Sequence, residues 1–499
     1  MSLLGVDVGT TGCKAAAYST AGACLAIAYR EYPVLHPRPG EAELDSRAVL
    51  ARVWEAIAEV AHRTGADPIT ALAISSMGEA MTPVSRDREV LGTSILSSDD
   101  RGAEYIAELT ERISPEDFYR INPNILATNY SLPKLLWLRE HEPETYARAD
   151  KFLLWGDLVA FRLGGDAVTS YSLANRTLLF DIQREDWSEE LLARSGVARD
   201  KLPRTAASGS IVGAVGDAAA AQLGLPRNVA VVLGGHDQCC NCLGAGIHEA
   251  HKAVCGIGTF ECITTVFDHL PDREAMRQQG LSIEHHVLPG LFVSFVYNQA
   301  GSLVRWFRDT FAAAEKEQVR DGEDIYDRLA GEMPGGPTSL IVLPYFETTG
   351  PPHLIADATG LIAGLRMGTT RGEILKAIME GATFHFADSV EALGRMGLDT
   401  SEFVATGGGA KSDQWLQIQA DIFGRPFARP RITECSVLGA AMLAGMATGV
   451  FDGVAEAASR FVKLDRVFEP DPSRHSRYRE KLEAYRQLFP LVRGMLGRL

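Results

Sequence analysis

A glycine- and threonine-rich segment near the N-terminus combines an acidic side chain, a basic side chain and accessible backbone amides. It reads Asp7-Val-Gly-Thr-Thr-Gly-Cys-Lys14 and lies between two apolar runs. The glycines let successive N–H groups approach a phosphate closely, and Thr10, Thr11 and Lys14 add further donors. Asp7 can hold Mg²⁺ directly or through water, because this ion takes one or two carboxylates. The simpler alternative is a hairpin with an exposed lysine, but an aspartate that ends an apolar strand needs a partner.

A second carboxylate, Asp237, follows an apolar run and two glycines at the start of a predicted helix. The segment reads Leu233-Gly-Gly-His-Asp-Gln238. A carboxylate at such a position is oriented by the backbone and open to a cleft. In phosphoryl transfer, an aspartate placed in this way accepts the proton of the attacking hydroxyl. Asp237 could instead cap the helix, but the presence of the Asp7 segment favours the catalytic interpretation.

Three cysteines, Cys239, Cys240 and Cys242, follow directly and raise the question of a metal site with His236. A structural zinc site needs four ligands with paired spacing, and the sequence has no second cysteine pair elsewhere. We therefore predict small buried thiols. The Leu-Gly-Ala-Gly that follows consists of small residues and indicates a tight helix contact.

Two further segments could contact a ligand. Residues 404–413 read Val-Ala-Thr-Gly-Gly-Gly-Ala-Lys-Ser-Asp, a strand, a glycine run and a helix start that suits an anion, an adenine or a ribose. Glu79 follows the apolar run Ile69–Ser75 and could accept hydrogen bonds from a polyol, or lie in a surface loop. Asp99 and Arg101 could pair at a cleft or form a solvated turn. His285 and His286 are expected in a surface loop.

Short apolar strands and amphipathic helices alternate along the chain and indicate an α/β architecture. The second half restarts the plan of the first, because Ile257-Gly-Thr259 corresponds to Val8-Gly-Thr10 in the same strand–turn–strand context. The first copy carries Asp7 and Lys14 where the second has Gly256 and Ile263. We place the boundary near Gly246, giving domains 1–246 and 247–499. The charged segment after Asp465 predicts a surface helix, for which packing back on the first domain is left open. The predicted elements are Leu3–Val8, Cys13–Tyr18, Cys24–Tyr29, Ser46–His62, Ile69–Ser75, Val229–Gly234, Lys252–Phe267, Leu291–Tyr297 and Ser302–Phe311.

The composition excludes several classes of protein. The 499 residues include 49 Lys+Arg and 64 Asp+Glu, for a formal net charge of −15. An acidic chain lacks the basic stripe of a nucleic-acid binder. The apolar run Leu438–Val450 is too short to span a bilayer. Eight cysteines without a disulfide framework and no secretory signal favour a reduced, cytoplasmic enzyme, and a homodimer is compatible with these observations.

Two longer signatures give the chain a resemblance to the FGGY family of carbohydrate kinases. The first is Lys134-Leu-Leu-Trp-Leu-Arg-Glu-His141. The second is Gly360-x-Ile-x-Gly-Leu365, followed by Glu373-Ile-x-x-Ala-Ile-Met-Glu380. The resemblance implies an α/β fold with two actin-like (ribonuclease H-like) domains that close around ATP and a sugar.

The same resemblance implies roles for individual residues. Asp237 would be the general base and Asp7 would serve Mg²⁺. The sugar would contact Glu79, Asn129, His236 and Gln238. The phosphates and nucleotide would contact Thr10, Thr11, Lys14, Gly258, Thr259, Gly301, Gly408, Gly409 and Asp413.

Ser97, Met77-Gly78 and Cys262 depart from the family pattern on the sugar side, so the sugar stays open. The chain is predicted to be an ATP-dependent kinase of a ketose or polyol. A non-catalytic sugar sensor and an actin-like ATPase scaffold are the alternatives.

Overall fold

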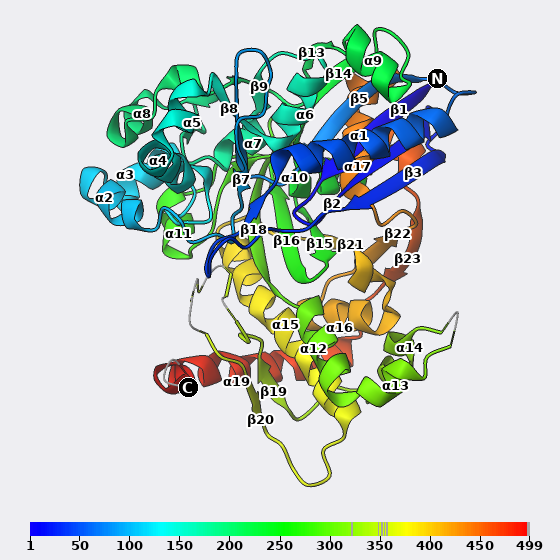
Figure 1. Ribbon diagram of the computed structural model, residues 1–499. Coiled ribbons are helices and arrows are strands. Elements are labelled where there is room, and N and C mark those ends of the chain that lie inside the picture. The colour runs from blue at the N-terminus through cyan, green and yellow to red at the C-terminus, as the bar shows by residue number, and fades with distance from the viewer. Residues whose placement is uncertain (321–322, 348, 351–352, 354, 356–357, 497–499) are drawn as a thin grey trace.

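In the computed structural model, the chain forms two β-sheets with helices packed around them (Figure 1). The structure describes all residues except 321–322, 348, 351–352, 354, 356–357 and 497–499. The first sheet has the order β13-β14-β5-β1-β2-β3. Its strands are β1 (Ser2–Val8), β2 (Gly12–Ser19), β3 (Cys24–Glu31), β5 (Ile69–Ser76), β13 (Ile211–Ala214) and β14 (Ala230–His236).

The second sheet has the order β17-β18-β16-β15-β21-β22-β23. Its strands are β15 (Lys252–Ile257), β16 (Phe260–Phe267), β17 (Glu284–His285), β18 (Phe292–Gln299), β21 (Glu402–Thr406), β22 (Phe427–Pro430) and β23 (Leu464–Phe468). Each predicted strand and helix overlaps an observed element, because buried β-branched and aromatic runs bounded by glycine are strong strand signals.

The two sheets share one topology. In each, the first strand pairs antiparallel with the second and parallel with a strand that follows later in the chain. A further parallel strand and an antiparallel edge strand complete the series on that side. The internal repeat predicted from the sequence is therefore present in the strand pairing.

The register of the two hairpins corrects one detail of the prediction. Asp7 lies opposite Lys14 in the first hairpin, whereas Gly256 lies opposite Cys262 in the second. The first turn is closed by a hydrogen bond from Gly9 N to Gly12 O (3.0 Å), and the second by one from Gly258 N to Phe260 O (2.9 Å). The second turn is thus one residue shorter, and Cys262, not Ile263, is the counterpart of Lys14.

Two helices cross at the boundary between the halves. α10 (Asp237–Gly244) follows β14, and α17 (Cys435–Ala447) follows β22. A Cβ atom on Gly244 would lie 1.9 Å from Cys435 O, and one on Gly439 would lie 2.0 Å from Cys240 O. The predicted tight helix contact is therefore confirmed. The thiols of Cys239, Cys240 and Cys242 are buried in this contact, as predicted.

The helices of the second half surround its sheet (Figure 1). They include α12 (Gly301–Phe311), α15 (Arg371–Arg395), α16 (Asp413–Phe423) and α19 (Pro472–Leu496), while α1 (Ser46–Arg63) covers the first sheet. The tail helix α19 packs against α16 and β19 (Ile341–Leu343) of its own half, not back on the first. Tyr478, Leu482 and Tyr485 are buried in that contact, because one face of this charged helix is apolar.

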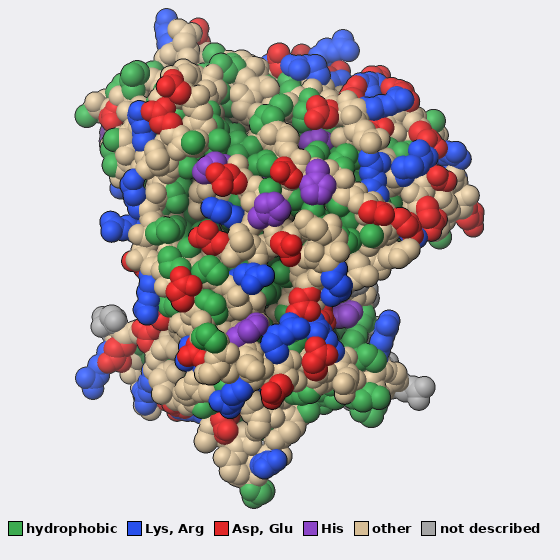
Figure 2. Space-filling view, turned by 180° about the vertical axis from the view of Figure 1, so that it is seen from behind, with side chains coloured by type: hydrophobic (Ala, Val, Ile, Leu, Met, Phe, Trp, Pro, Cys, Tyr) green, Lys and Arg blue, Asp and Glu red, His purple; other side chains and the backbone are tan. Residues whose placement is uncertain are grey.

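The surface and the helices agree with the composition. Basic and acidic side chains are interspersed on the face shown in Figure 2, and no continuous basic stripe crosses that face. Within the described part of the chain, no helix is both long and apolar enough to cross a membrane.

Candidate active site

A cavity of about 220 Å³ lies between the two halves of the chain. Residues from the ends of β5 and β14 meet residues from β16 and β18 there. The first half contributes Thr10, Met77, Gly78, Glu79, Ala80, Ser97, Arg176, His236, Asp237 and Gln238, and the second contributes Phe260, Cys262, Phe295 and Tyr297. Glu79, His236, Asp237 and Gln238, predicted from distant segments, are thus brought to one cavity.

Asp237 begins α10 at the end of β14, and its side chain remains 26% exposed. Burial, together with the negative charges of Asp7 and Glu79, raises the pKa of this carboxyl to about 8, although the backbone N–H of Gln238 and the charge of Arg176 lower it. A carboxyl whose pKa lies near neutral pH is well matched to accepting and releasing a proton. Ser75 of β5 pairs with both Asp7 and Gly235, so Asp7 and Asp237 lie at the same end of the sheet.

Asp7 lies at the end of β1, where Ser75 Oγ donates a hydrogen bond of 2.7 Å to Oδ1. Burial raises the pKa of Asp7 to about 6, although Ser75 and Lys14 lower it. Lys14, opposite on β2, forms an ion pair with Glu434 from the second half. The β1–β2 hairpin and the start of α17 therefore face each other across the boundary.

The carboxylates at this site suit a hard divalent cation. Asp7 and Asp237 repel each other in a partly desolvated site, so a bound cation would relieve both. Among the described residues, no group of three or more His, Cys, Asp or Glu side chains could hold a metal by itself. The residues therefore fit Mg²⁺, which keeps waters and shares its coordination with substrate phosphates.

His236 is held neutral beside the candidate base. Burial and the nearby Arg176 charge lower its pKa well below the usual value. Its Nε2 lies 3.3 Å from Asp237 Oδ1, its backbone N–H donates to Ser172 Oγ (3.1 Å), and its ring packs edge-on against Phe295. His236 can therefore orient Asp237 without adding charge.

A second cavity of about 330 Å³ lies in the second half and is lined by glycines, by apolar side chains and by the charged residues Arg305, Asp324, Asp327 and Lys411. A Cβ on Gly301 would lie 2.1 Å from Gly258 O, so the helix α12 can start there only with glycine. A Cβ on Gly408 would meet no atom within 4 Å, which leaves the backbone open to a ligand. The lining includes Gly258, Thr259, Gly301, Val304, Leu375, Met379, Gly408, Gly409, Ser412 and Trp415.

The remaining predicted residues divide between these places. Thr10 lines the first cavity, and Thr11 is exposed at the tip of the same turn. Asn129 lines a small adjoining cavity. Asp413 directly follows Ser412 of the glycine-rich cavity and pairs with Arg429 (2.7 Å) and Arg466 (2.5 Å).

Sequence reasoning missed Arg176 and Glu284. Arg176 follows α7 (Tyr171–Asn175), and its guanidinium pairs with Glu79 and with Glu284 of β17. The prediction of a surface loop at His285 and His286 is wrong, because their exposed fractions are 5% and 4%. Nothing in the local spacing signals these residues, since the pairing joins segments more than 100 residues apart.

Residues of the two sequence signatures hold elements next to the cavities in place. Lys134 Nζ donates to Arg101 O (2.7 Å), and Asp99 pairs with Arg101 (2.7 Å) in the interior. The Asp99–Arg101 pair is therefore neither a cleft lining nor a solvated turn, and it holds the loop that carries Ser97. Glu380 accepts hydrogen bonds from Thr338 Oγ1 (2.6 Å) and Tyr478 OH (2.9 Å), which ties α15 to α19.

Comparison with known proteins matches both halves to one family. Residues 2–244 match the N-terminal domain model of the FGGY family of carbohydrate kinases, and residues 255–448 match the C-terminal domain model. A xylulose kinase of Bacillus subtilis (strain 168) is 30% identical over 490 residues, covering 98% of this chain and 96% of that protein. An autoinducer-2 kinase of Klebsiella pneumoniae (strain ATCC 700721 / MGH 78578) is 29% identical, covering 99% of this chain and 94% of that protein.

The fold agrees with these matches. A crystal structure of ligand-bound xylulose kinase from Lactobacillus acidophilus superposes with a TM-score of 0.89 at 25% identity, covering 100% of this chain and 99% of that one. Two α/β domains with a sugar-kinase cavity between them define the class. The chain belongs to the FGGY family of carbohydrate kinases, and it is an enzyme of that class.

Proposed function

We propose that the enzyme transfers the γ-phosphoryl group of ATP to a hydroxyl of a ketose or polyol, with Asp237 as the general base. The observation that supports this most is the placement of Asp237 with Glu79 in the cavity between the halves, with Asp7 at the same end of the sheet, on the other side of β5. Carboxylates gathered in a partly desolvated site are typical of places where protons or cations exchange.

In the proposed reaction, the sugar lies in the 220 Å³ cavity and the nucleotide in the glycine-lined cavity. The sugar oxygen forms a bond to the γ-phosphorus while the bond from that phosphorus to the β,γ-bridging oxygen breaks. Asp237 takes the hydroxyl proton, and ADP leaves. Thr10, Thr11 and Lys14 donate to the phosphate oxygens. The ammonium group of Lys14 leaves its ion pair with Glu434 and pairs with phosphate instead.

Asp7, with Asp237 nearby, would hold the magnesium ion. The ion supplies charge neutralisation of the phosphate oxygens when bound. Asp7 remains fixed by its hydrogen bond from Ser75 and is therefore positioned before any ligand arrives.

The test is ADP production with a panel of neutral pentuloses, hexuloses and polyols that includes D-xylulose, a choice guided by the relatives. We expect sugar-dependent turnover, and we expect Asp237→Asn to lower kcat by roughly 10²–10⁴-fold, as for loss of a general base. Asp117→Asn, an exposed aspartate on α3 (Pro115–Ile121), is the control.

The same sugar panel also distinguishes a kinase from the two alternative functions. ADP release without any sugar would favour an ATPase scaffold, and sugar binding without turnover would favour a sensor. Nearly full turnover by the Asp237→Asn variant would remove Asp237 from the role of base.

A further inference from the structure

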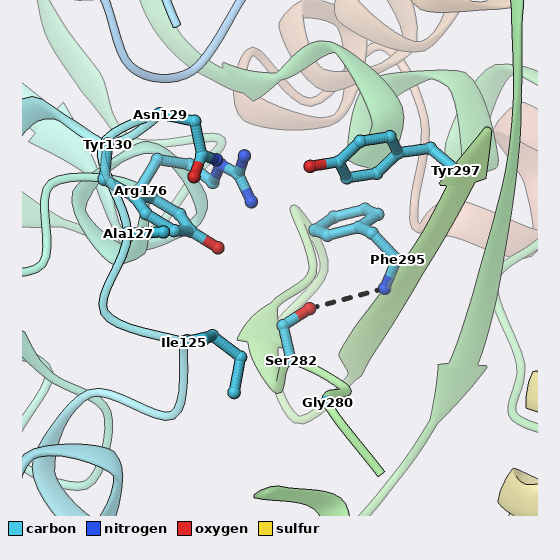
Figure 3. Close-up of a pocket in the computed structure, with 9 residues that line it drawn as sticks. All are labelled: Ile125, Ala127, Asn129, Tyr130, Arg176, Gly280, Ser282, Phe295 and Tyr297. Carbon is cyan, nitrogen blue, oxygen red and sulfur yellow. Dashed lines mark hydrogen bonds between the residues drawn. The ribbon is translucent and has the colours of Figure 1, made fainter. Parts of the chain in front are cut away.

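A smaller cavity of about 30 Å³ adjoins the sugar cavity, and the two share Arg176, Phe295 and Tyr297 in their linings. In Figure 3, the guanidinium of Arg176 and the hydroxyl of Tyr297 point toward each other across this space, and Asn129 and Tyr130 lie beside the arginine. The small volume extends the sugar cavity past Arg176.

Arg176 is held between two carboxylates from opposite halves of the chain. Its Nε donates to Glu79 Oε1 at 2.8 Å, and its Nη1 donates to Glu284 Oε1 at 2.7 Å. Its exposed fraction is 8%, and that of Glu284 is 0%. The faces of Tyr130 and Phe295 flank the guanidinium at 4.8 and 5.8 Å. The guanidinium is therefore fixed in position before a substrate binds.

This cluster keeps both donors and acceptors available. A guanidinium has five N–H groups, and the contacts described for Arg176 use three of them. Both glutamates accept from Arg176 through Oε1, and within the described part of the chain Glu284 Oε2 is buried without a partner. A hydroxyl needs one acceptor and one donor, which is what such a cluster offers to a polyol.

The same cluster is poorly suited to a negative charge. Arg176 is the one Lys or Arg among the described residues that line the two cavities, and two carboxylates already share it. Burial and the charge of Glu79 raise the pKa of Glu284 to about 7, although Arg176 lowers it. The lining of the larger cavity holds Glu79 and Asp237 against one arginine, so it already has more acidic groups than one cation neutralises, and a buried unpaired anion is costly.

We propose that the Glu79–Arg176–Glu284 cluster determines specificity by admitting neutral polyhydroxylated substrates and rejecting sugar acids. The inference rests on the proposed kinase function and narrows its substrate class. In this proposal, a sugar hydroxyl binds Glu79 and the spare N–H groups of Arg176. Glu284 lies outside both cavity linings and holds Arg176 by sharing its charge, so a substrate carboxylate finds no unpaired cation.

The test compares D-glucitol with D-gluconate, which differ at one terminal carbon, by calorimetric titration at pH 8, together with turnover assays on D-xylulose. The wild-type enzyme is expected to bind glucitol at least roughly 100-fold more tightly than gluconate, because of the cost of an unpaired buried charge. The variant Glu284→Gln keeps the shape of the side chain and removes one negative charge. It is expected to reduce that ratio to about 10-fold or less, mainly by tighter gluconate binding.

The matched control is Glu43→Gln, which also removes a carboxylate paired with an arginine, Arg101 at 2.8 Å. Unlike Arg176, the partner of Glu284, Arg101 lines neither cavity. Glu43→Gln is expected to leave the ratio unchanged. If Glu284→Gln weakens both ligands equally, the cluster is structural and the proposal is wrong. Wild-type binding of gluconate as tight as that of glucitol, or binding of neither ligand, also contradicts it.

The two proposals can fail separately. Selective binding of glucitol over gluconate without phosphorylation of any neutral sugar would contradict the kinase function. It would not contradict the proposal that the cluster determines specificity. Equal phosphorylation of neutral sugars and sugar acids would contradict the cluster proposal alone.

Discussion

The two hairpins that open the two halves have the same strand pairing and different chemistry. In β1–β2, Asp7 and Lys14 face each other beside a turn of two threonines, whereas in β15–β16 the corresponding positions are Gly256 and Cys262. The first hairpin meets a cavity lined by two carboxylates and one arginine, and the second borders a cavity that combines glycines and apolar side chains with two basic and two acidic ones. The same strand pairing thus carries a charged pair beside the turn in the first half and uncharged residues there in the second.

The strongest test of this asymmetry is Asp7→Asn. The change keeps the size of the side chain and removes its charge, so kcat/KM is expected to fall about 10³-fold, in line with a loss of several kcal/mol of charge stabilisation. Steady-state kinetics over a magnesium titration would measure it. Adding Gly256→Asp to this variant is the control, and recovery of activity would mean that the two hairpins are interchangeable.

Lys14→Ala should have the next largest effect. Loss of a charge-assisted hydrogen bond to phosphate, about 1.5–3 kcal/mol, should raise KM for ATP about 10–100-fold. In contrast, Glu434→Gln removes the partner that competes for Lys14 and should leave ATP binding equal or tighter. Unchanged ATP affinity and kcat in the lysine variant would count against the phosphate-binding role of the first hairpin.

Alanine substitutions of the contact glycines in α10 and α17, the helices that follow equivalent strands, should have similar effects on stability. Gly244→Ala and Gly439→Ala each place a methyl group on a backbone oxygen of the opposite helix, so each should lower the free energy of unfolding by about 1–3 kcal/mol. Thermal and urea unfolding would measure this. Gly368→Ala, where a Cβ would meet no atom within 4 Å, is the control. A large loss in one variant alone would show that the crossing is not symmetric.

The smallest expected effect is a change in stability with pH. The carboxyls of Asp7 in the first hairpin and of Glu261, a buried residue of β16 in the second, have pKa values of about 6 and about 7, raised mainly by burial. The folded state then binds more protons than the unfolded state above pH 4. This stabilisation is complete below the unfolded pKa values and is lost as pH rises through 6 to 7.

The melting temperature of the free protein should therefore fall between pH 5 and 8. Asp7→Asn and Glu261→Gln should each flatten this decline, and magnesium with ATP should reduce the Asp7 contribution alone. An equal response of both variants to the ligands would contradict the assignment of the cation to the first hairpin.

Local sequence patterns were sufficient to predict the strands and helices and to select many of the candidate site residues. Strands such as β1 and turns such as Gly9–Gly12 are encoded by contiguous apolar and glycine patterns, and Asp7 and Asp237 end such strands. The pairing of Arg176 with Glu284 depends on how the halves meet, which no local pattern encodes. Asp413 follows the glycine run as expected, but its carboxylate forms ion pairs with Arg429 and Arg466 on neighbouring strands.

The crossing of α10 and α17 also fixes the position of Asp237. Because a Cβ on Gly244 or Gly439 would overlap a backbone oxygen of the opposite helix, the two backbones are in direct contact. At the end of this contact, Ser436 Oγ of α17 donates to the backbone oxygen of Asp237 at 3.3 Å. A larger side chain at either glycine would therefore separate the helices where the second half anchors Asp237.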